Sequence, residues 1–186
     1  MNSNNDDGVI EWRSQYPPEA KKWIWIEGIY GLILILISPV LIWLFLAGYP
    51  GVFLNLTETQ DHWISVIGVT WIGGMLGGAV FSTKWLIHAV GEYKWYRDRQ
   101  LWRFITPHAA GAITLGFITL LDSNFLPIVT ITETMSLLGL VGLAFFVGYF
   151  ADSVIGQFAS FAEGVFGRVE SGSVPNEVKQ EQEERE

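Results

Sequence analysis

Cysteine is absent from this chain of 186 residues, and histidine occurs only three times. The lack of cysteine excludes disulfide bonds, thiolate metal ligands and catalysis by a thiol group. The serine-hydrolase, zinc-protease and phosphate-loop signatures are missing as well. No metal site is expected, because the pair His88 and Glu92 offers too few ligands to close one. The sequence therefore predicts a protein that is not an enzyme and holds no cofactor.

Charge is also scarce, at 16% of the residues, whereas 50% of the residues are hydrophobic. Four apolar runs account for most of the chain, at 23–48, 63–90, 101–121 and 135–154. At ~1.5 Å per helical residue, each run is long enough to cross the ~30 Å hydrocarbon core of a bilayer. The sequence predicts an all-α fold, a four-helix transmembrane bundle over residues 23–154.

Lysine and arginine are missing from two of the connections, 49–62 and 122–134. They gather instead before the first run, around the end of the second and after the fourth: Arg13, Lys21, Lys22, Lys84, Lys94, Arg97, Arg99, Arg103 and Arg168. Because cytoplasmic loops are enriched in basic residues, both termini and the middle loop are predicted to be cytoplasmic. We expect a multi-pass protein of the inner (plasma) membrane, with the bilayer as its surroundings. Its first run should be retained, since the segment before it is too long and acidic for a signal peptide.

The two ends of the chain are not predicted to be part of the transmembrane bundle. Residues 1–22 form a polar, cytoplasmic N-terminal segment, and residues 155–169 show helical spacing of apolar side chains typical of an amphipathic, interfacial helix on the cytoplasmic side. Residues 170–186 contain six Glu against Lys179 and Arg185, which predicts a disordered acidic tail. Nucleic acid is not an expected partner, because the net charge is −8 and the only basic segment is the short middle loop.

Two prolines fall inside the predicted spans. Pro39 is expected to kink the first helix without ending it, since neighbouring groups in a membrane bundle can satisfy the freed carbonyl. Thr106 and Pro107 have the residue types of a helix start, so the third helix is expected to begin again there, with 101–105 along the interface. The apolar segment 125–131 either dips into the membrane or extends a neighbouring helix.

The second run contains the most specific local pattern, two overlapping GxxxG motifs formed by Gly73, Gly74, Gly77 and Gly78. Glycines four residues apart form a flat strip on which another helix can pack closely in lipid. The partner is either a helix of the same chain or a helix of a second copy. At 100° per residue, Lys84 and His88 continue this face toward the cytoplasmic end.

No charged residue falls at the centre of any predicted span. The ionisable groups sit toward the cytoplasmic side, and six of them are candidates for a polar cluster: Glu27, Lys84, His88, Arg103, His108 and Asp152. One interpretation is a polar mouth for ions or protons, because charge in a membrane is expensive and usually functional. The other is that each group lies at headgroup depth and anchors its helix. The lack of charge at mid-depth disfavours a proton-coupled carrier.

Three segments resemble a broad group of small, largely uncharacterised bacterial four-span proteins. They are the Gly73–Gly78 strip, Trp102 and Arg103 followed by Pro107, and the sequence from Val147 to Asp152. The resemblance covers roughly residues 63–167 and implies a location in the bacterial inner membrane, but no activity.

We therefore expect a non-enzymatic membrane protein that self-associates through the second helix or acts as a membrane subunit of a larger complex. The alternative is a small oligomeric ion channel or membrane-permeabilising effector, suggested by the alignment of Lys84 and His88 with the glycine face.

Overall fold

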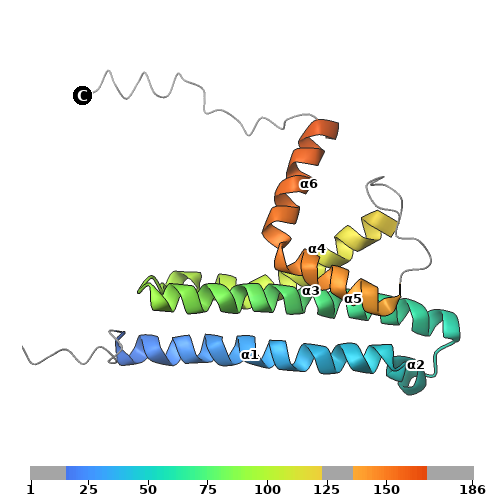
Figure 1. The fold of residues 1–186 in the computed structure, drawn as a ribbon, viewed down its shortest axis with the longest axis horizontal. Coiled ribbons are helices and arrows are strands. Elements are labelled where there is room, and N and C mark those ends of the chain that lie inside the picture. Colours follow the sequence, from blue (N-terminus) through green and yellow to red (C-terminus); the bar gives the residue numbers. More distant parts are fainter. Residues whose placement is uncertain (1–15, 123–135, 167–186) are drawn as a thin grey trace, which may run out of the picture. The chain divides into compact units, whose positions relative to one another are not determined.

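The structure, a computed structural model, describes residues 16–122 and 136–166, and all regular elements in these ranges are helical. The helices are α1 (Pro18–Leu46), α2 (Tyr49–Leu54), α3 (Glu58–Gly91), the short 3-10 helix η1 (Arg97–Arg99), α4 (Gln100–Asp122), α5 (Leu137–Tyr149) and α6 (Ala151–Phe166) (Figure 1). The predicted all-α class is confirmed for the described residues.

Three segments are long and apolar enough to cross a membrane: α1, α3, and α4 together with η1. A fourth candidate exists only if α5 and the first turns of α6 count as one span. The chain is therefore compatible with an integral membrane protein. With 13 residues at ~1.5 Å each, α5 alone falls short of a ~30 Å core.

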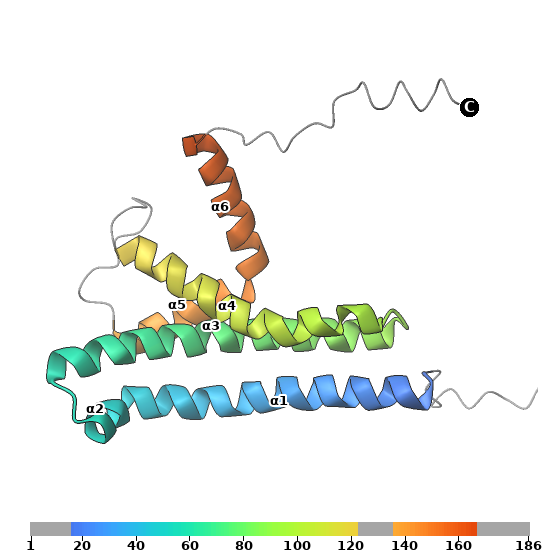
Figure 2. The same ribbon diagram turned by 180° about the vertical axis from the view of Figure 1, so that it is seen from behind.

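The central element of the bundle is α3, which packs against α1, α4 and α5 (Figures 1 and 2). Its buried residues are mostly small, including four glycines, Ala79, Ser65 and Thr70. Small side chains let three helices approach one backbone, and in lipid such close packing replaces the hydrophobic drive that water supplies. Larger apolar residues complete the core: Val69, Ile118 and Leu140 meet at one place, and Ile42, Ile72 and Met75 at another.

The reversal between α1 and α3 is built from local signals. Gly48 (φ 72°) and Asn55 (φ 51°) adopt left-handed backbone conformations on either side of α2, which glycine and asparagine tolerate best. Thr57 then caps α3: its hydroxyl accepts the Gln60 N–H at 3.4 Å, and the Gln60 side chain accepts the Thr57 N–H at 3.1 Å. This capping box directs α3 back alongside α1.

The predicted new start of the third helix at Pro107 is wrong, because α4 runs unbroken from Gln100 to Asp122. Pro107 has no N–H for the carbonyl of Arg103, four residues earlier. The Ser82 hydroxyl of α3 donates to that carbonyl at 3.3 Å, and the Tyr30 hydroxyl of α1 donates to the next carbonyl, Phe104, at 3.0 Å. Side chains of neighbouring helices thus supply what the proline removes.

The predicted fourth run, 135–154, corresponds to two helices with a break at Phe150, where φ is −103° and ψ is 24°. The second of them, α6, starts earlier than the predicted amphipathic helix, at Ala151, and from Asp152 onward it is part of a separate unit. Within this unit Asp152, Ile155, Gln157 and Glu163 are exposed. The predictions for 1–15, 125–131 and 170–186 lie outside the described residues.

Candidate functional site between α1 and α4

One buried carboxylate distinguishes the contact between α1 and α4. Glu27 lies on the buried face of α1, which continues at helical spacing through Gly31, Ser38 and Ile42. Its Oε2 lies 2.8 Å from Nη1 of Arg103 and accepts the indole N–H of Trp95 at 3.3 Å. The Glu27 and Arg103 side chains are only 2% and 11% exposed. At this depth little water screens the attraction between the two charges.

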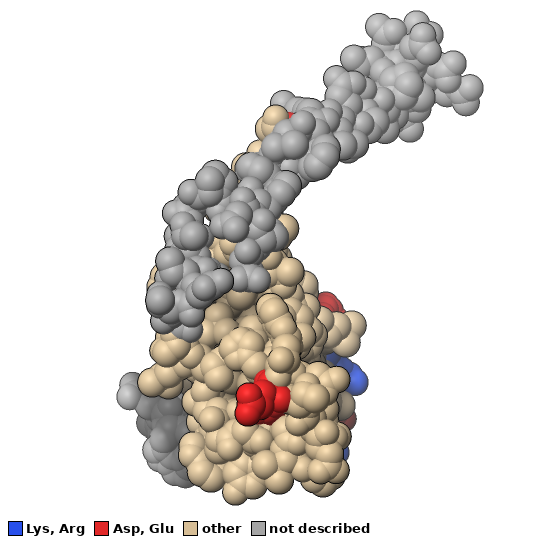
Figure 3. All heavy atoms as spheres, turned by 90° about the vertical axis from the view of Figure 1, so that its right-hand side faces the viewer, with Lys and Arg blue, Asp and Glu red and all other residues tan. Residues whose placement is uncertain are grey.

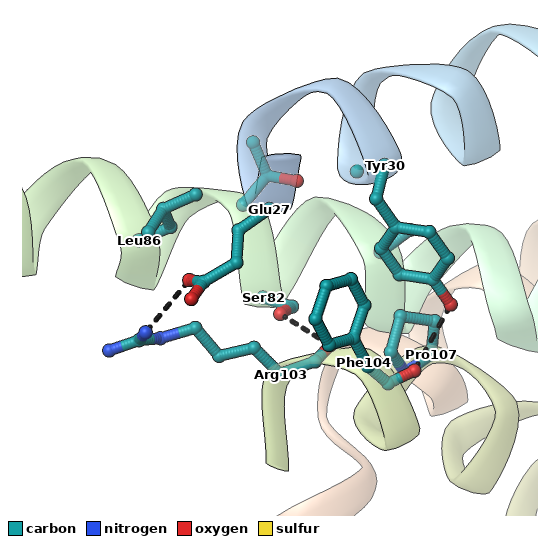
Figure 4. Close-up of a pocket in the computed structure, with 10 residues that line it drawn as sticks. Glu27, Tyr30, Ser82, Leu86, Arg103, Phe104 and Pro107 are labelled. Carbon is teal, nitrogen blue, oxygen red and sulfur yellow. Dashed lines mark hydrogen bonds and ion pairs between the residues drawn. The ribbon is translucent and has the colours of Figure 1, made fainter. Parts of the chain in front are cut away.

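A second polar contact lies one helical turn further along α1. The Tyr30 hydroxyl is 2.9 Å from Nε2 of His108, and the Tyr30 ring packs edge-on against Phe104, with ring centres 4.8 Å apart. Figure 4 shows Glu27 and Tyr30 of α1 reaching the same stretch of α4, on either side of Phe104. Because two turns of each helix take part, the contact fixes the register of α1 against α4 as well as their distance.

A hollow of about 10 Å³ lies among these groups and is lined by Glu27, Tyr30, Gly31, Ala79, Ser82, Thr83, Leu86, Arg103, Phe104 and Pro107 (Figure 4). This is room for about one water molecule. The second carboxylate oxygen of Glu27, Oε1, is buried and has no hydrogen-bond partner among the described residues. A carboxylate, a guanidinium and three hydroxyls around so small a space suit helix locking better than binding of a larger ligand.

Of the six residues of the predicted polar cluster, the five that lie in the helical bundle do not form one group. Glu27, Arg103 and His108 come together at the contact just described. Lys84 lies elsewhere, with its Nζ 3.1 Å from the Tyr149 hydroxyl of α5. His88 pairs with Glu92 at 2.8 Å on the exposed end of α3. Asp152 opens the separate unit that holds α6.

Lys84 and His88, whose alignment with the glycine face suggested the channel alternative, contact different partners. The Lys84 side chain reaches α5, and the His88 side chain pairs with Glu92 just after α3. Among the described residues, no group of three or more His, Asp or Glu side chains is placed to hold a metal ion.

The glycine strip of α3 is occupied by helices of the same chain. A Cβ added at Gly73 would lie 2.9 Å from the Cβ of Ala144 in α5, and one at Gly77 would collide with the backbone of Phe145 and Tyr149. A Cβ at Gly74 would collide with Thr114 in α4, and one at Gly78 would lie 2.5 Å from the Cβ of Ala110. Gly73 and Gly77 thus pack against α5, and Gly74 and Gly78 pack against α4. Of the two partners that the sequence left open, the structure shows the intrachain one.

Sequence reasoning missed Tyr30, Trp95 and Ser82 at the contact between α1 and α4. Tyr30 had a usable signal, because it lies three residues after Glu27 and therefore on the same face of α1. Trp95 reads as an ordinary interfacial tryptophan. Ser82 had no signal in the sequence, because its role depends on the position of the Arg103 carbonyl in another helix.

Comparisons with protein families, with curated proteins and with solved structures find no match to this chain. The resemblance to small bacterial four-span proteins therefore stays a prediction.

Proposed function

We propose that this chain is a non-enzymatic integral membrane protein that self-associates, or joins a larger membrane complex, through the outer face of α4. The supporting observation is a second strip of small residues. Ala112 and Gly116 are exposed one turn apart on α4, and a Cβ added at Gly116 would have no atom of the described residues within 4 Å. His108 and Thr119 extend the same exposed face at helical spacing.

This face differs from the glycine strip of α3 in one respect that matters for association. On α3 the space above each strip glycine is filled by α4 or α5, whereas above Gly116 it is open. Since packing of small residues drives helix association in lipid, an open strip at membrane depth is the surface best suited to a further helix. The opposite face of α4, with Ala110 and Thr114, is already buried against α3.

Leucine substitutions test the proposal. We expect Ala112→Leu and Gly116→Leu to convert the associated form, measured by crosslinking in membranes and by size in mild detergent, to the monomer. Gly28→Leu is the matched control, because Gly28 on α1 also has open space around it. An unchanged association of both α4 variants would contradict the role of this face. A monomeric wild type would leave only a different membrane protein as the partner, to be sought by photocrosslinking from position 116.

The proposed orientation places the start of α1 and the end of α3 in the cytoplasm. Charge supports it: the basic residues Lys21, Lys22, Arg97 and Arg99 belong to that end, while Glu58 and Asp61 lie in the first turn of α3 at the other. Figure 3 looks onto this second end, where acidic side chains face the viewer and basic ones are confined to the edge. Because the chain has no cysteine, single-cysteine variants report sidedness directly. Asn55→Cys should react with an impermeant maleimide in intact cells, and Lys94→Cys should not; the reverse result would invert the topology.

A further inference from the structure

Basic side chains from two segments distant in the sequence lie together at one end of the bundle. Lys21 and Lys22 belong to the first turns of α1, and Arg97 and Arg99 form the ends of η1. The Arg97 guanidinium lies 5.6 Å from the centre of the Trp23 ring, a cation–π contact that places η1 against the start of α1. Figures 1 and 2 both show the start of α1 at the same end of the bundle as the end of α3.

The connection that carries these arginines is held in place by two hydrogen bonds of Trp95. The Tyr16 hydroxyl accepts the Trp95 N–H at 3.3 Å, and the Trp95 indole donates to Glu27 at 3.3 Å. The connection after α3 is therefore tied both to the segment before α1 and to the ion pair beneath it. A pre-positioned set of cations loses less conformational entropy on binding an anion than a flexible loop does.

The positive charge of this surface is only half compensated by the acidic residues that the structure describes there. The ion pairs among them join Glu27 to Arg103 and Glu92 to His88 and Lys94; none includes Lys21, Lys22, Arg97 or Arg99. All four of these side chains are exposed. The same two segments contain the acidic residues Glu19 and Asp98, so the surface has two more basic than acidic groups.

Exposed aromatic residues lie within about one helical turn of the basic groups along the chain. Trp25, Tyr96 and Trp102 are 70%, 57% and 61% exposed, and the Arg99 guanidinium lies 5.8 Å from the centre of the Tyr96 ring. Exposed tryptophan and tyrosine are favoured at the depth of lipid headgroups, where the ring meets hydrocarbon and the N–H or O–H meets water. The basic groups therefore stand where lipid phosphates stand when α1 crosses the bilayer.

We propose that Lys21, Lys22, Arg97 and Arg99 form a binding surface for the phosphate of an anionic phospholipid. This inference rests on the proposed function as an integral membrane protein. The guanidinium fork suits a phosphate, whose oxygens accept two parallel hydrogen bonds, and the lysines add charge without fixed geometry. A lipid is favoured over a free anion because the exposed rings beside the cations offer a second, apolar contact that only an acylated phosphate uses.

The neighbouring Lys94 provides a matched control. It lies in the same connection, but its Nζ is 2.9 Å from Oε2 of Glu92. Its charge is already paired, so removing it should leave lipid binding nearly unchanged. Charge count alone does not predict this difference between Lys94 and Arg97.

The test is a titration of the full-length, detergent-solubilised protein with phosphatidylglycerol or phosphatidylcholine, with bound lipids counted by native mass spectrometry. We expect at least tenfold tighter binding of phosphatidylglycerol, since each basic residue near an anionic lipid surface contributes about fivefold. Arg97→Gln with Arg99→Gln should remove most of this preference, and Lys94→Gln should change it by less than about twofold. Lys21→Gln with Lys22→Gln is the second variant, in case the arginine variant unfolds.

Three results would overturn the proposal: equal affinity for the two lipids, an equal loss in the Lys94→Gln control, or complete displacement of the lipid by equimolar inorganic phosphate. The last would identify a free anion as the ligand. Extraction of membranes with alkaline carbonate distinguishes failure of the lipid-binding proposal from failure of the proposal that the chain is an integral membrane protein. A chain that is extracted is not integral, whereas an inserted chain that binds both lipids equally refutes only the lipid surface.

Discussion

Replacing Arg103 by alanine should destabilise the bundle by about 3–5 kcal/mol, the range observed when one partner of a buried ion pair is removed. The burial of the pair is the reason for choosing this range. The Glu27 side chain is 2% exposed, and its Oε2 accepts hydrogen bonds from Arg103 at 2.8 Å and from Trp95 at 3.3 Å. The substitution leaves the carboxylate with only the longer hydrogen bond, from the uncharged indole of Trp95. An exposed pair would contribute no more than about 1 kcal/mol.

A second substitution, Glu27→Gln, removes the charge in the Arg103→Ala background. We expect the double variant to be more stable than Arg103→Ala alone, with a coupling of about 1–3 kcal/mol between the two sites. Recovery by the second change distinguishes loss of an ion pair from loss of the packing that the long arginine stem provides.

The assay is reversible unfolding in mixed micelles, followed by tryptophan fluorescence, for the wild type, both single variants and the double variant. Lys94→Ala is the control, because its ion pair with Glu92 is exposed and its loss should leave the midpoint nearly unchanged. If Arg103→Ala shifts stability no more than Lys94→Ala, the buried pair does not hold α1 to α4. If the two single effects add without coupling, the contact does not act as a pair.

Two further predictions concern the helix interface and the exposed end of α3. Gly77→Ala should destabilise the bundle by about 1–3 kcal/mol, because the new methyl collides with the backbone of α5. Gly28→Ala is the control and should be neutral or slightly stabilising in the same assay, because Gly28 lies in open space. Equal effects of the two substitutions would mean that α5 does not pack on the glycine strip. The hydrogen bond from Lys94, and then the charge of His88, lower the pKa of Glu92 below its ordinary value. Because the folded-state pKa is lowered, the stabilisation is present above the unfolded carboxyl pKa of about 4.3 and is lost as pH falls through the folded value. Lys94→Gln should raise the midpoint of the Glu92 carboxyl resonance in an NMR titration, and an unmoved midpoint would contradict this pairing.

The positions of the helices were largely predictable, because hydrophobicity along the chain is a local property. The predicted runs 23–48 and 63–90 fall almost entirely within α1 and α3, and 101–121 falls within α4. The errors arose where local signals compete with tertiary contacts. Thr106 and Pro107 read as a helix start, but Ser82 and Tyr30 satisfy the backbone around the proline and α4 continues.

The candidate site was predictable only in part. Glu27, Arg103 and His108 could be selected because ionisable groups stand out beside apolar runs. The separation of Lys84 and His88 from them could not be foreseen, because two residues on one helical face can still reach different partners. A long lysine side chain extends to Tyr149 in α5, and His88 bonds four residues along to Glu92.

The sequence by itself determined that the described chain is all helical, with segments long and apolar enough to cross a membrane, because chain length and apolar content are read residue by residue. It also located the residues that allow close packing, since only glycine leaves a helix surface flat. The tertiary structure alone decided which helices use that flat surface. Gly73 and Gly77 face α5, and Gly74 and Gly78 face α4, whereas Ala112 and Gly116 of α4 are exposed. A glycine strip does not by itself select a particular partner helix, so its partner depends on where the rest of the chain places a helix.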